Sequence, residues 1–265
     1  MNAHHTRPLG FSLVELSIVL VILGLLTGGI LGGQALIRAA EIRSLTSDFS
    51  KYQAVVMTFR DKYFAIPGDM SNAITFWGKA AGNGVNGACA DFVSTSPATC
   101  NGNGDGQIFS NGTAGKVIYE ELRFWQHLAN AGLIEGSYTG TYTATSGGYT
   151  AGVNVPPTKM DKISVSTWWY GATAADATNF AYPGGNAYEL YSASGNVFDT
   201  FRPEEAWNID TKLDDGMPGT GKIISNKGNT TYPCTDRANV VADAGAAYRL
   251  SSTSKICTLS IANAF

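Results

Sequence analysis

Residues Asn101 to Gln107 place oxygen-bearing side chains at alternate positions, in the order Asn-Gly-Asn-Gly-Asp-Gly-Gln. Such alternation lets one short loop surround a cation, and calcium binds roughly six to eight oxygen ligands. The spacing, with an apolar residue two positions after the third glycine, is that of the first half of an EF-hand calcium loop. We therefore predict a calcium site with ligands from this loop: Asn101, Asn103, Asp105 and Gln107.

The second half of the EF-hand pattern is missing, because Gly112 stands where a bidentate glutamate belongs. Among the first three candidate ligands only Asp105 is charged, so acids elsewhere in the chain must complete the site. Acids at the start of the following helix are the first candidates, and two others are more distant: Glu120 and Glu121, then Asp69 and Asp91. A glycine- and asparagine-rich turn without an ion is the competing interpretation. A bound ion would have a structural role.

Other motifs with catalytic associations do not extend to a complete site. The segment Gly216–Lys222 fits the first seven positions of a P-loop, but Ile223 stands where a Ser or Thr must hold magnesium. Ser252–Lys255 matches S-x-x-K without its companion motifs. Beyond the first five residues the chain holds one histidine, His127, for which we expect a packing or exposed role, and there is no G-x-S-x-G elbow. We expect a protein that is not an enzyme.

Composition narrows the class of protein further. The chain has 265 residues, with 18 Lys and Arg against 21 Asp and Glu, which argues against a nucleic-acid-binding protein with its basic footprint. A hydrophobic content of 44% excludes a disordered chain. The length suits one sizeable globular domain, and no internal repeat or long linker divides it.

The cysteines predict disulfides and an oxidising compartment. Four cysteines allow three pairings, and we expect Cys89–Cys100 and Cys234–Cys257 because the members of each pair lie in the same loop-rich region. Neither pair has the C-x-x-C spacing typical of zinc or redox sites. Disulfides place the domain outside the cytoplasm. Four buried thiols are the alternative.

A long apolar segment precedes this domain. Leu16–Ile37 carries no formal charge and exceeds the about 20 residues that cross a bilayer as a helix. The apolar region of a secretory signal peptide is shorter, about 7–15 residues, and ends at a small-residue cleavage site that is absent here. Five glycines provide three G-x-x-x-G pairs, a spacing that lets membrane helices approach closely: Gly24, Gly28, Gly29, Gly32 and Gly33. We predict one membrane-spanning helix.

Glu15 is the one acid at the edge of this segment. An unpaired carboxylate costs about 2.5–3.5 kcal/mol near mid-membrane and less near the surface. One interpretation is a helix-start acid that interacts favourably with the helix dipole. The other is an acid with a positively charged partner.

The stretch Gly10-Phe-Ser-Leu-Val-Glu15-Leu, between a short polar leader and the apolar helix, resembles the processing motif of type IV prepilins and type II secretion pseudopilins. The resemblance covers residues 8 to about 40. It implies that prepilin peptidase cleaves between Gly10 and Phe11, that Phe11 becomes N-methylated, and that Glu15 neutralises the amino terminus of a neighbouring subunit. It also favours the calcium interpretation, because pseudopilin relatives use calcium to order loops of the head.

The resemblance supplies partners and location as well. Arg7 precedes the apolar segment, but Arg38 and Arg43 follow it, so positive charges alone do not orient the helix. The resemblance implies a single-pass inner-membrane precursor with a periplasmic head, then an extracellular or periplasmic filament. Its implied partners are other pilin subunits, prepilin peptidase and an inner-membrane assembly platform.

Beyond Arg38 the pattern becomes amphipathic. Apolar residues recur at steps of three and four, which predicts a helix with one buried face: Ile42, Leu45, Phe49, Tyr52, Val56, Phe59 and Tyr63. The stripe ends at Pro67-Gly68, and its length suits packing against the chain's own head better than a coiled coil.

The head reads as a mixture of helices and strands. We expect a helix over Ile118–Leu133 and a short one from Pro203 to about Asp214. Strands are expected over Ile163–Tyr170 and Ala187–Tyr191, and residues from Tyr138 to Tyr149 have strand-like composition. The predicted fold is α+β and pilin-like: a leader over 1–10, a helix over 11–66 (membrane-spanning over 11–37, amphipathic over 38–66) and a head with an antiparallel sheet over 67–265.

The sequence thus predicts a subunit of a type IV pilus or of a type II secretion pseudopilus. The head is larger than expected of a small major pseudopilin, which favours a pilus or minor subunit. The alternative is a membrane-anchored, calcium-dependent adhesin or sugar-binding module that does not polymerise. An anchored hydrolase is disfavoured by the shortage of histidines.

Overall fold

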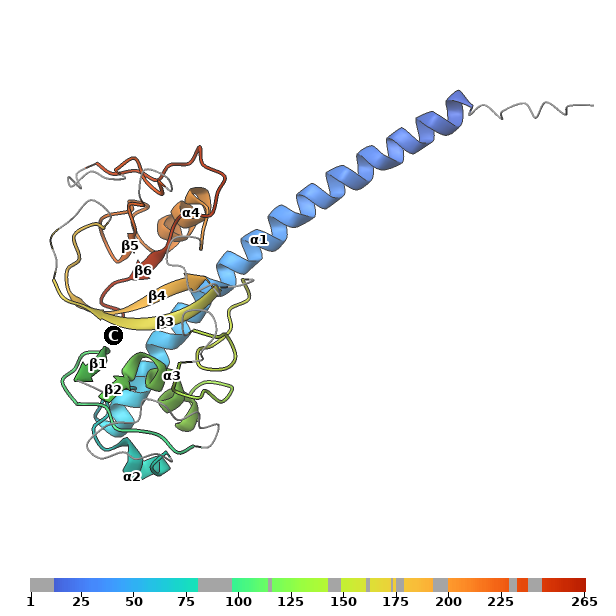
Figure 1. Ribbon diagram of the computed structural model, residues 1–265. Coiled ribbons are helices and arrows are strands. Elements are labelled where there is room, and N and C mark those ends of the chain that lie inside the picture. The colour runs from blue at the N-terminus through green and yellow to red at the C-terminus, as the bar shows by residue number, and fades with distance from the viewer. Residues whose placement is uncertain are drawn as a thin grey trace, which may run out of the picture. The chain divides into compact units, whose positions relative to one another are not determined.

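The chain consists of two compact units, 1–44 and 45–265. The structure, a computed structural model shown in Figure 1, describes the following residues: 12–80, 97–113, 116–142, 149–160, 163–172, 174, 179–192, 200–228, 233–237 and 245–265. One helix, α1 (Leu13–Tyr63), begins in the first unit and ends in the second.

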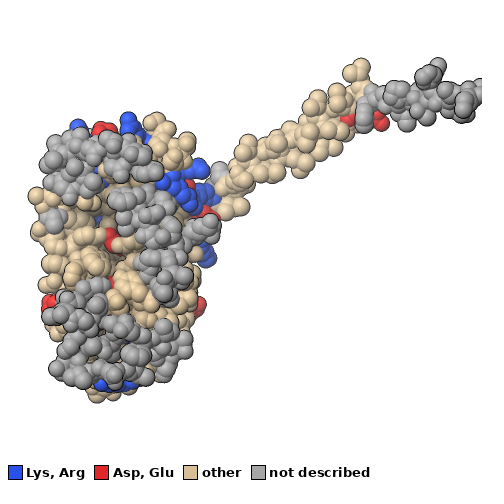
Figure 2. Space-filling view, in the orientation of Figure 1, with Lys and Arg blue, Asp and Glu red and all other residues tan. Residues whose placement is uncertain are grey.

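In the first unit α1 carries no charged residue from Leu16 to Ile37. An 18-residue window reaches a mean hydropathy of 2.4, so the helix is long and apolar enough, by length and composition, to cross a membrane. Figure 2 shows its surface uncharged along this stretch, between the acid at its start and the charged residues from Arg38 onward. Most of its large apolar side chains are at least half exposed, for example Leu25 at 73% and Leu31 at 68%.

In the second unit α1 buries one face. The predicted stripe is confirmed from Leu45 to Phe59, and its members are almost fully buried: Leu45, Phe49, Tyr52, Val56 and Phe59. Lys51, between two members of the stripe, and Arg60, directly after its last member, are exposed. The stripe meets the centre of the head, where the Tyr52 ring packs edge-on against Trp125 at 4.9 Å and near Tyr188 at 6.1 Å.

The head contains a four-stranded antiparallel sheet in the order β3-β4-β6-β5. Its members are β3 (Ile163–Tyr170), β4 (Gly185–Ser192), β5 (Ile223–Ser225) and β6 (Leu259–Ile261). The first two confirm the expected strands, and in their register Val165 lies opposite Leu190. The sheet with the long helix confirms the predicted α+β fold.

Both outer strands of this sheet are partly covered by other backbone. Beside β3, the Trp169 amide donates to the Ile108 carbonyl at 2.7 Å. Beside β5, the Ser225 amide donates to the Pro218 carbonyl at 2.8 Å. The segments around Ile108 and Pro218 therefore take up backbone groups that an open edge would leave available.

Helix α4 (Pro203–Leu213) connects the strand pair to β5 and confirms the second expected helix. Proline at its first position and acids in its first turn favour this start, and the Glu205 carboxylate accepts the Arg202 amide at 3.0 Å. Shorter elements complete the head: α2 (Ala73–Trp77), β1 (Ser110–Thr113) and β2 (Lys116–Tyr119), the last two forming a hairpin.

Helix α3 (Glu120–Asn130) begins later than predicted. Ile118, assigned to the helix from its spacing, lies in β2 and pairs with Asn111 of β1. The helix is buried from Glu120 to Leu128, polar residues included, because it packs beside β3 while α1 covers it through Trp125. An apolar stripe alone could not locate a helix that is enclosed on every side.

The strand-like interpretation of Tyr138–Tyr149 was wrong for its described residues, 138–142 and 149, which form no strand. Their polar groups bind irregular backbone instead: the Thr139 amide donates to the Val153 carbonyl at 2.9 Å. The Tyr and Thr content that suggested a strand serves side-chain packing, as in the 5.6 Å contact between the Tyr142 and Tyr149 rings.

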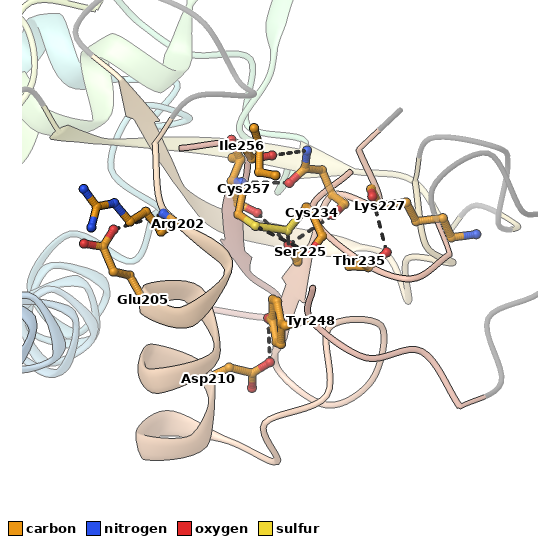
Figure 3. Close-up of a disulfide and its surroundings, with 12 residues drawn as sticks. Arg202, Glu205, Asp210, Ser225, Lys227, Cys234, Thr235, Tyr248, Ile256 and Cys257 are labelled. Atoms are coloured by element: carbon orange, nitrogen blue, oxygen red, sulfur yellow. Dashed lines mark hydrogen bonds between the residues drawn. A yellow bond between two sulfur atoms is a disulfide. The ribbon is translucent and has the colours of Figure 1, made fainter. Parts of the chain in front are cut away.

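The disulfide Cys234–Cys257 forms as predicted, and both cysteines are fully buried (Figure 3). It fastens the last part of the chain beside β5, where Ser225 Oγ lies 3.2 Å from Cys234 Sγ. Cys100 is also disulfide-bonded. Its expected partner Cys89 lies outside the described residues.

Candidate functional site

The start of α1 is fixed by a reciprocal pair of hydrogen bonds. The Val14 amide donates to Ser12 Oγ at 3.1 Å, and the Ser12 amide donates to Glu15 Oε2 at 2.9 Å. This is a capping box, in which two amides at a helix start gain side-chain acceptors. In the single chain, Glu15 therefore acts as a helix-start acid.

The capping box leaves the charge of Glu15 uncompensated, because a backbone amide is neutral. A carboxylate that leaves water is stable when it is paired with a positive charge. The predicted partner is the amino terminus of another subunit. The cleavage site itself, Gly10 and Phe11, lies outside the described residues.

A second candidate site lies where the glycine-rich loop meets the turn after α1. Carboxylate oxygens of Asp69, Asp105 and Glu120 all lie within 4.8 Å of one another. The loop and helix-start acids were predicted to meet, with Asp69 and Asp91 as the more distant candidates; Asp91 lies outside the described residues. Asp69 and Glu120 are buried, whereas Asp105 is exposed.

The two buried acids bind the loop backbone directly. Asp69 accepts amides of Gly104 at 2.6 Å, Asp105 at 3.1 Å and Gly106 at 2.8 Å. Glu120 accepts the amides of Asn103 at 3.0 Å and of Phe109 at 3.2 Å. Gly104 and Gly106 have φ angles of 79° and 84°, which glycine adopts without strain and which turn their amides toward Asp69. The acids thus shape the loop even without an ion.

The remaining predicted ligands have other partners. Asn101 Oδ1 accepts the Ile74 amide at 3.0 Å, at the start of α2. Glu121 accepts the Tyr142 hydroxyl at 2.6 Å. Asn103 borders the acidic group, with its side-chain amide 2.8 Å from Asp105 Oδ2, and the Gln107 backbone amide donates to Asp105 Oδ1 at 2.9 Å. The structure therefore brings Asp105 and Glu120 together and directs Asn101 and Glu121 elsewhere.

Burial and mutual repulsion raise the pKa values of the two buried carboxyls of this group. The pKa of Glu120 is raised from 4.5 to about 8, mainly by burial; two amide hydrogen bonds oppose this shift, and the nearby charges of Asp69 and Asp105 contribute to it. Burial is also the main cause that raises the pKa of Asp69. Clustered carboxylates of this kind bind protons or a divalent cation to relieve their repulsion. Asp69, Asp105 and Glu120 therefore form one group, among the described residues, that could hold a metal.

A different acidic group lies just before the segment that imitates a P-loop. Oxygens of Asp210, Asp214 and Asp215 lie within 4.8 Å of one another at the end of α4. They accept the amides of the loop itself, including Gly216 at 3.1 Å and Met217 at 2.8 Å. Carboxylates thus take the amides that would cradle a phosphate, and the segment is a turn from α4 to β5, as the sequence suggested.

His127 is a fully buried residue of the head, in agreement with a packing role. Its Nδ1 accepts the Gly68 amide at 3.0 Å, and its Nε2 lies 3.0 Å from Thr99 Oγ1. Burial lowers its pKa to about 3, so the ring is neutral at physiological pH. It anchors the turn that carries Asp69, one residue after Gly68.

Sequence reasoning underrated two of these features. The Ser12–Glu15 capping box has the S-x-x-E signature, which is visible in the sequence. The closeness of Asp69 had no comparable signal, because the hydrogen bond from Gly68 to His127 that turns the chain joins residues 59 positions apart.

Comparison with known proteins adds one finding at the start of the chain. No curated protein and no solved structure matches the chain. Residues 7–31 match the prokaryotic N-terminal methylation motif, and this stretch includes Gly10, Phe11 and Glu15. Together with the apolar helix that follows, this motif is the signature of type IV pilin and pseudopilin precursors, proteins that prepilin peptidase processes.

Proposed function

We propose that this protein is a structural subunit of a helical filament, either a type IV pilus or a type II secretion pseudopilus. Processing between Gly10 and Phe11 releases an N-methylated subunit, which assembles through the apolar half of α1. The observation that carries the proposal is Glu15, an acid in the first turn of an apolar helix and inside the methylation motif.

The glycines in the apolar half of α1 support assembly because they leave space on the surface of the helix. A Cβ added at any of its glycines would meet no atom within 4 Å: Gly24, Gly28, Gly29, Gly32 and Gly33. Glycine weakens an isolated helix by about 1 kcal/mol per residue, so these positions are explained by close approach of other helices. A filament core provides such neighbours without exposing the helix to water.

The head then lies outside the cytoplasm, periplasmic before assembly and periplasmic or extracellular afterwards. Its disulfides support this location, since such bonds persist in oxidising compartments. The proposed role of the head is structural and recognitive rather than enzymatic. Its partners are other pilin subunits and the assembly platform of the inner membrane, and its size favours a pilus or minor subunit.

The test compares Glu15→Ala with Glu41→Ala in cells that carry a prepilin peptidase and an assembly system. Glu41 is a matched acid of the same helix, in an ion pair with Arg38 at 2.9 Å. We expect mass spectrometry to find methylated Phe11 in all proteins, while Glu15→Ala is absent from the sheared filament fraction and Glu41→Ala is retained.

Two results would contradict the proposal. An unprocessed leader, or cleavage at another position, would remove its basis. Normal recovery of Glu15→Ala in the filament fraction, or a wild-type protein that stays wholly in the membrane, would favour a membrane-anchored module that does not polymerise.

A further inference from the structure

A pocket of about 730 Å³ opens in the second unit where α1 ends. One wall is formed by Met57, Arg60 and Asp61 of the last turns of α1 and by Phe64 just beyond it. Ser71 and two glycines of the glycine-rich loop, Gly104 and Gly106, also line it. Ligand pockets of proteins have volumes of about 300–1,000 Å³. The pocket therefore has the size of a small-molecule site.

Phe64 is unfavourable for the isolated head in two respects. Its φ of 52° is in the left-handed region that follows many helices, where glycine or asparagine is preferred and a bulky residue is an outlier. Its side chain is 93% exposed, and within the described residues its ring contacts no other aromatic ring. An exposed bulky side chain in an unfavourable backbone conformation does not stabilise the head. Such a position is typical of residues that contact a ligand.

The polar groups around the pocket are available for binding. Arg60 and Asp61 are exposed neighbours, and neither side chain has an ion pair or hydrogen bond within the described part of the chain. Ser71 is exposed and adds a hydroxyl. The pocket thus combines a flat apolar surface, a fivefold hydrogen-bond donor, an acceptor and a hydroxyl.

We propose that this pocket binds a neutral sugar, with one pyranose ring stacked on Phe64. A pyranose has an apolar C–H face that packs on an aromatic ring, and its hydroxyls both donate and accept hydrogen bonds. Arg60 donates to such hydroxyls, and Asp61 accepts from them. The carboxylates of Asp61 and Asp69 disfavour an acidic sugar. This proposal goes beyond the filament function and holds whether or not the chain polymerises.

A concave site with a single exposed ring suits a sugar better than a second protein. Stable protein interfaces bury about 800 Å² on each partner and surround their anchors with further apolar contacts. Here the polar Arg60, Asp61 and Ser71 surround the ring instead.

The test uses the processed full-length protein in lipid nanodiscs, which avoids sugar-based detergents. Lactose, maltose and N,N′-diacetylchitobiose are the neutral probes, and digalacturonic acid is the acidic one. Saturation-transfer NMR should show contacts to the protons of one pyranose face, and calorimetry should give a saturable affinity. The Phe64→Gly variant should lose about tenfold in affinity, as expected for one aromatic contact. The head of this variant should unfold at a higher temperature, because glycine suits this backbone conformation.

The Leu250→Ala variant is the matched control, since Leu250 is 51% exposed and does not line the pocket. It should bind sugar as the wild type does. Failure of all three neutral sugars to bind, binding of the acidic sugar alone, or unchanged affinity in Phe64→Gly would each overturn the proposal. Loss of filament assembly in Phe64→Gly, without sugar binding by the wild type, would assign the ring to a subunit contact instead. Because binding is measured on unassembled protein, its outcome is independent of the Glu15 test.

Discussion

The Asp69 carboxylate lies 2.6 Å from the amide nitrogen of Gly104, although 35 residues separate them. This hydrogen bond joins the turn after α1 to the glycine-rich loop. Glu120, from α3, belongs to the same group of carboxylates. The acids that organise the loop are also those that a cation would bind.

Calcium is expected to stabilise the head through Asp69, Asp105 and Glu120. Chelation at pH 8 should make the loop more sensitive to protease, because the carboxylates then repel one another without a counter-ion. The variant Asp69→Asn should abolish the calcium effect, whereas Asp215→Asn, in the other acidic group, should keep it. Limited proteolysis with and without chelator measures both. Equal protease resistance in the two conditions would count against an ion at this loop.

Glu189 should make stability depend on pH. Burial raises its pKa from 4.5 to about 7, partly offset by hydrogen bonds from Tyr191 and Ser260. Because the folded protein favours the protonated form, this stabilisation is complete below pH 4.5 and is lost as pH rises through 7. A shift of this size corresponds to about 3 kcal/mol.

The Glu189→Gln variant isolates this contribution, since the amide carries no charge at any pH. Chemical denaturation between pH 5 and 8, with chelator present throughout, should show a smaller loss of stability than the wild type shows. Parallel curves for the two proteins would mean that Glu189 does not titrate as its burial implies.

The Cys234–Cys257 disulfide should contribute about 3 kcal/mol to the free energy of unfolding, because it closes a loop with a sequence separation of 23. The double variant Cys234→Ala/Cys257→Ala tests this by thermal unfolding. Wild type in reductant should unfold at or below the variant's midpoint, because reductant also breaks the disulfide of Cys100. An unchanged midpoint would show that the backbone pairing of Cys257 with Phe201 suffices.

Gly28→Leu should block assembly while leaving the single subunit intact. Leucine has a higher helix propensity than glycine by nearly 1 kcal/mol, and a Cβ at this position meets nothing within 4 Å beyond the adjacent backbone of its own helix, among the described residues. We expect normal membrane insertion and processing but little protein in the filament fraction. Leu25→Ile is the control, since it keeps the volume of an exposed side chain. Full recovery of Gly28→Leu would remove the close-packing explanation of the glycines.

The sequence predicted those elements whose pattern is local. The stripe from Leu45 to Phe59 follows the helical period, and β3 and β4 are short runs with strand-like composition between turn signals. The spacing of Ile118 continues that of α3, but its backbone pairs with Asn111 of β1, a contact that helical spacing does not reveal. Residues 138–142 have strand-like composition but form no strand, and the Thr139 amide donates to the carbonyl of Val153 in irregular backbone.

The candidate site was predictable only in part for the same reason. Alternating oxygens identified the loop, and helix position brought Glu120 to it. Asp69 required knowledge of the turn at Gly68, which depends on a hydrogen bond to the distant His127. Burial decides the charge state of Glu120, and burial is a property of the folded chain.

The covered outer strands have a consequence for a polymer. Copies crowded along a filament meet at very high local concentration, the condition under which exposed ladders fuse and subunits aggregate irreversibly. The amides of Trp169 and Ser225 already donate hydrogen bonds to the carbonyls of Ile108 and Pro218. At these positions the head offers no free strand amide to another chain. In the proposed filament, contacts between subunits would therefore depend on the apolar half of α1.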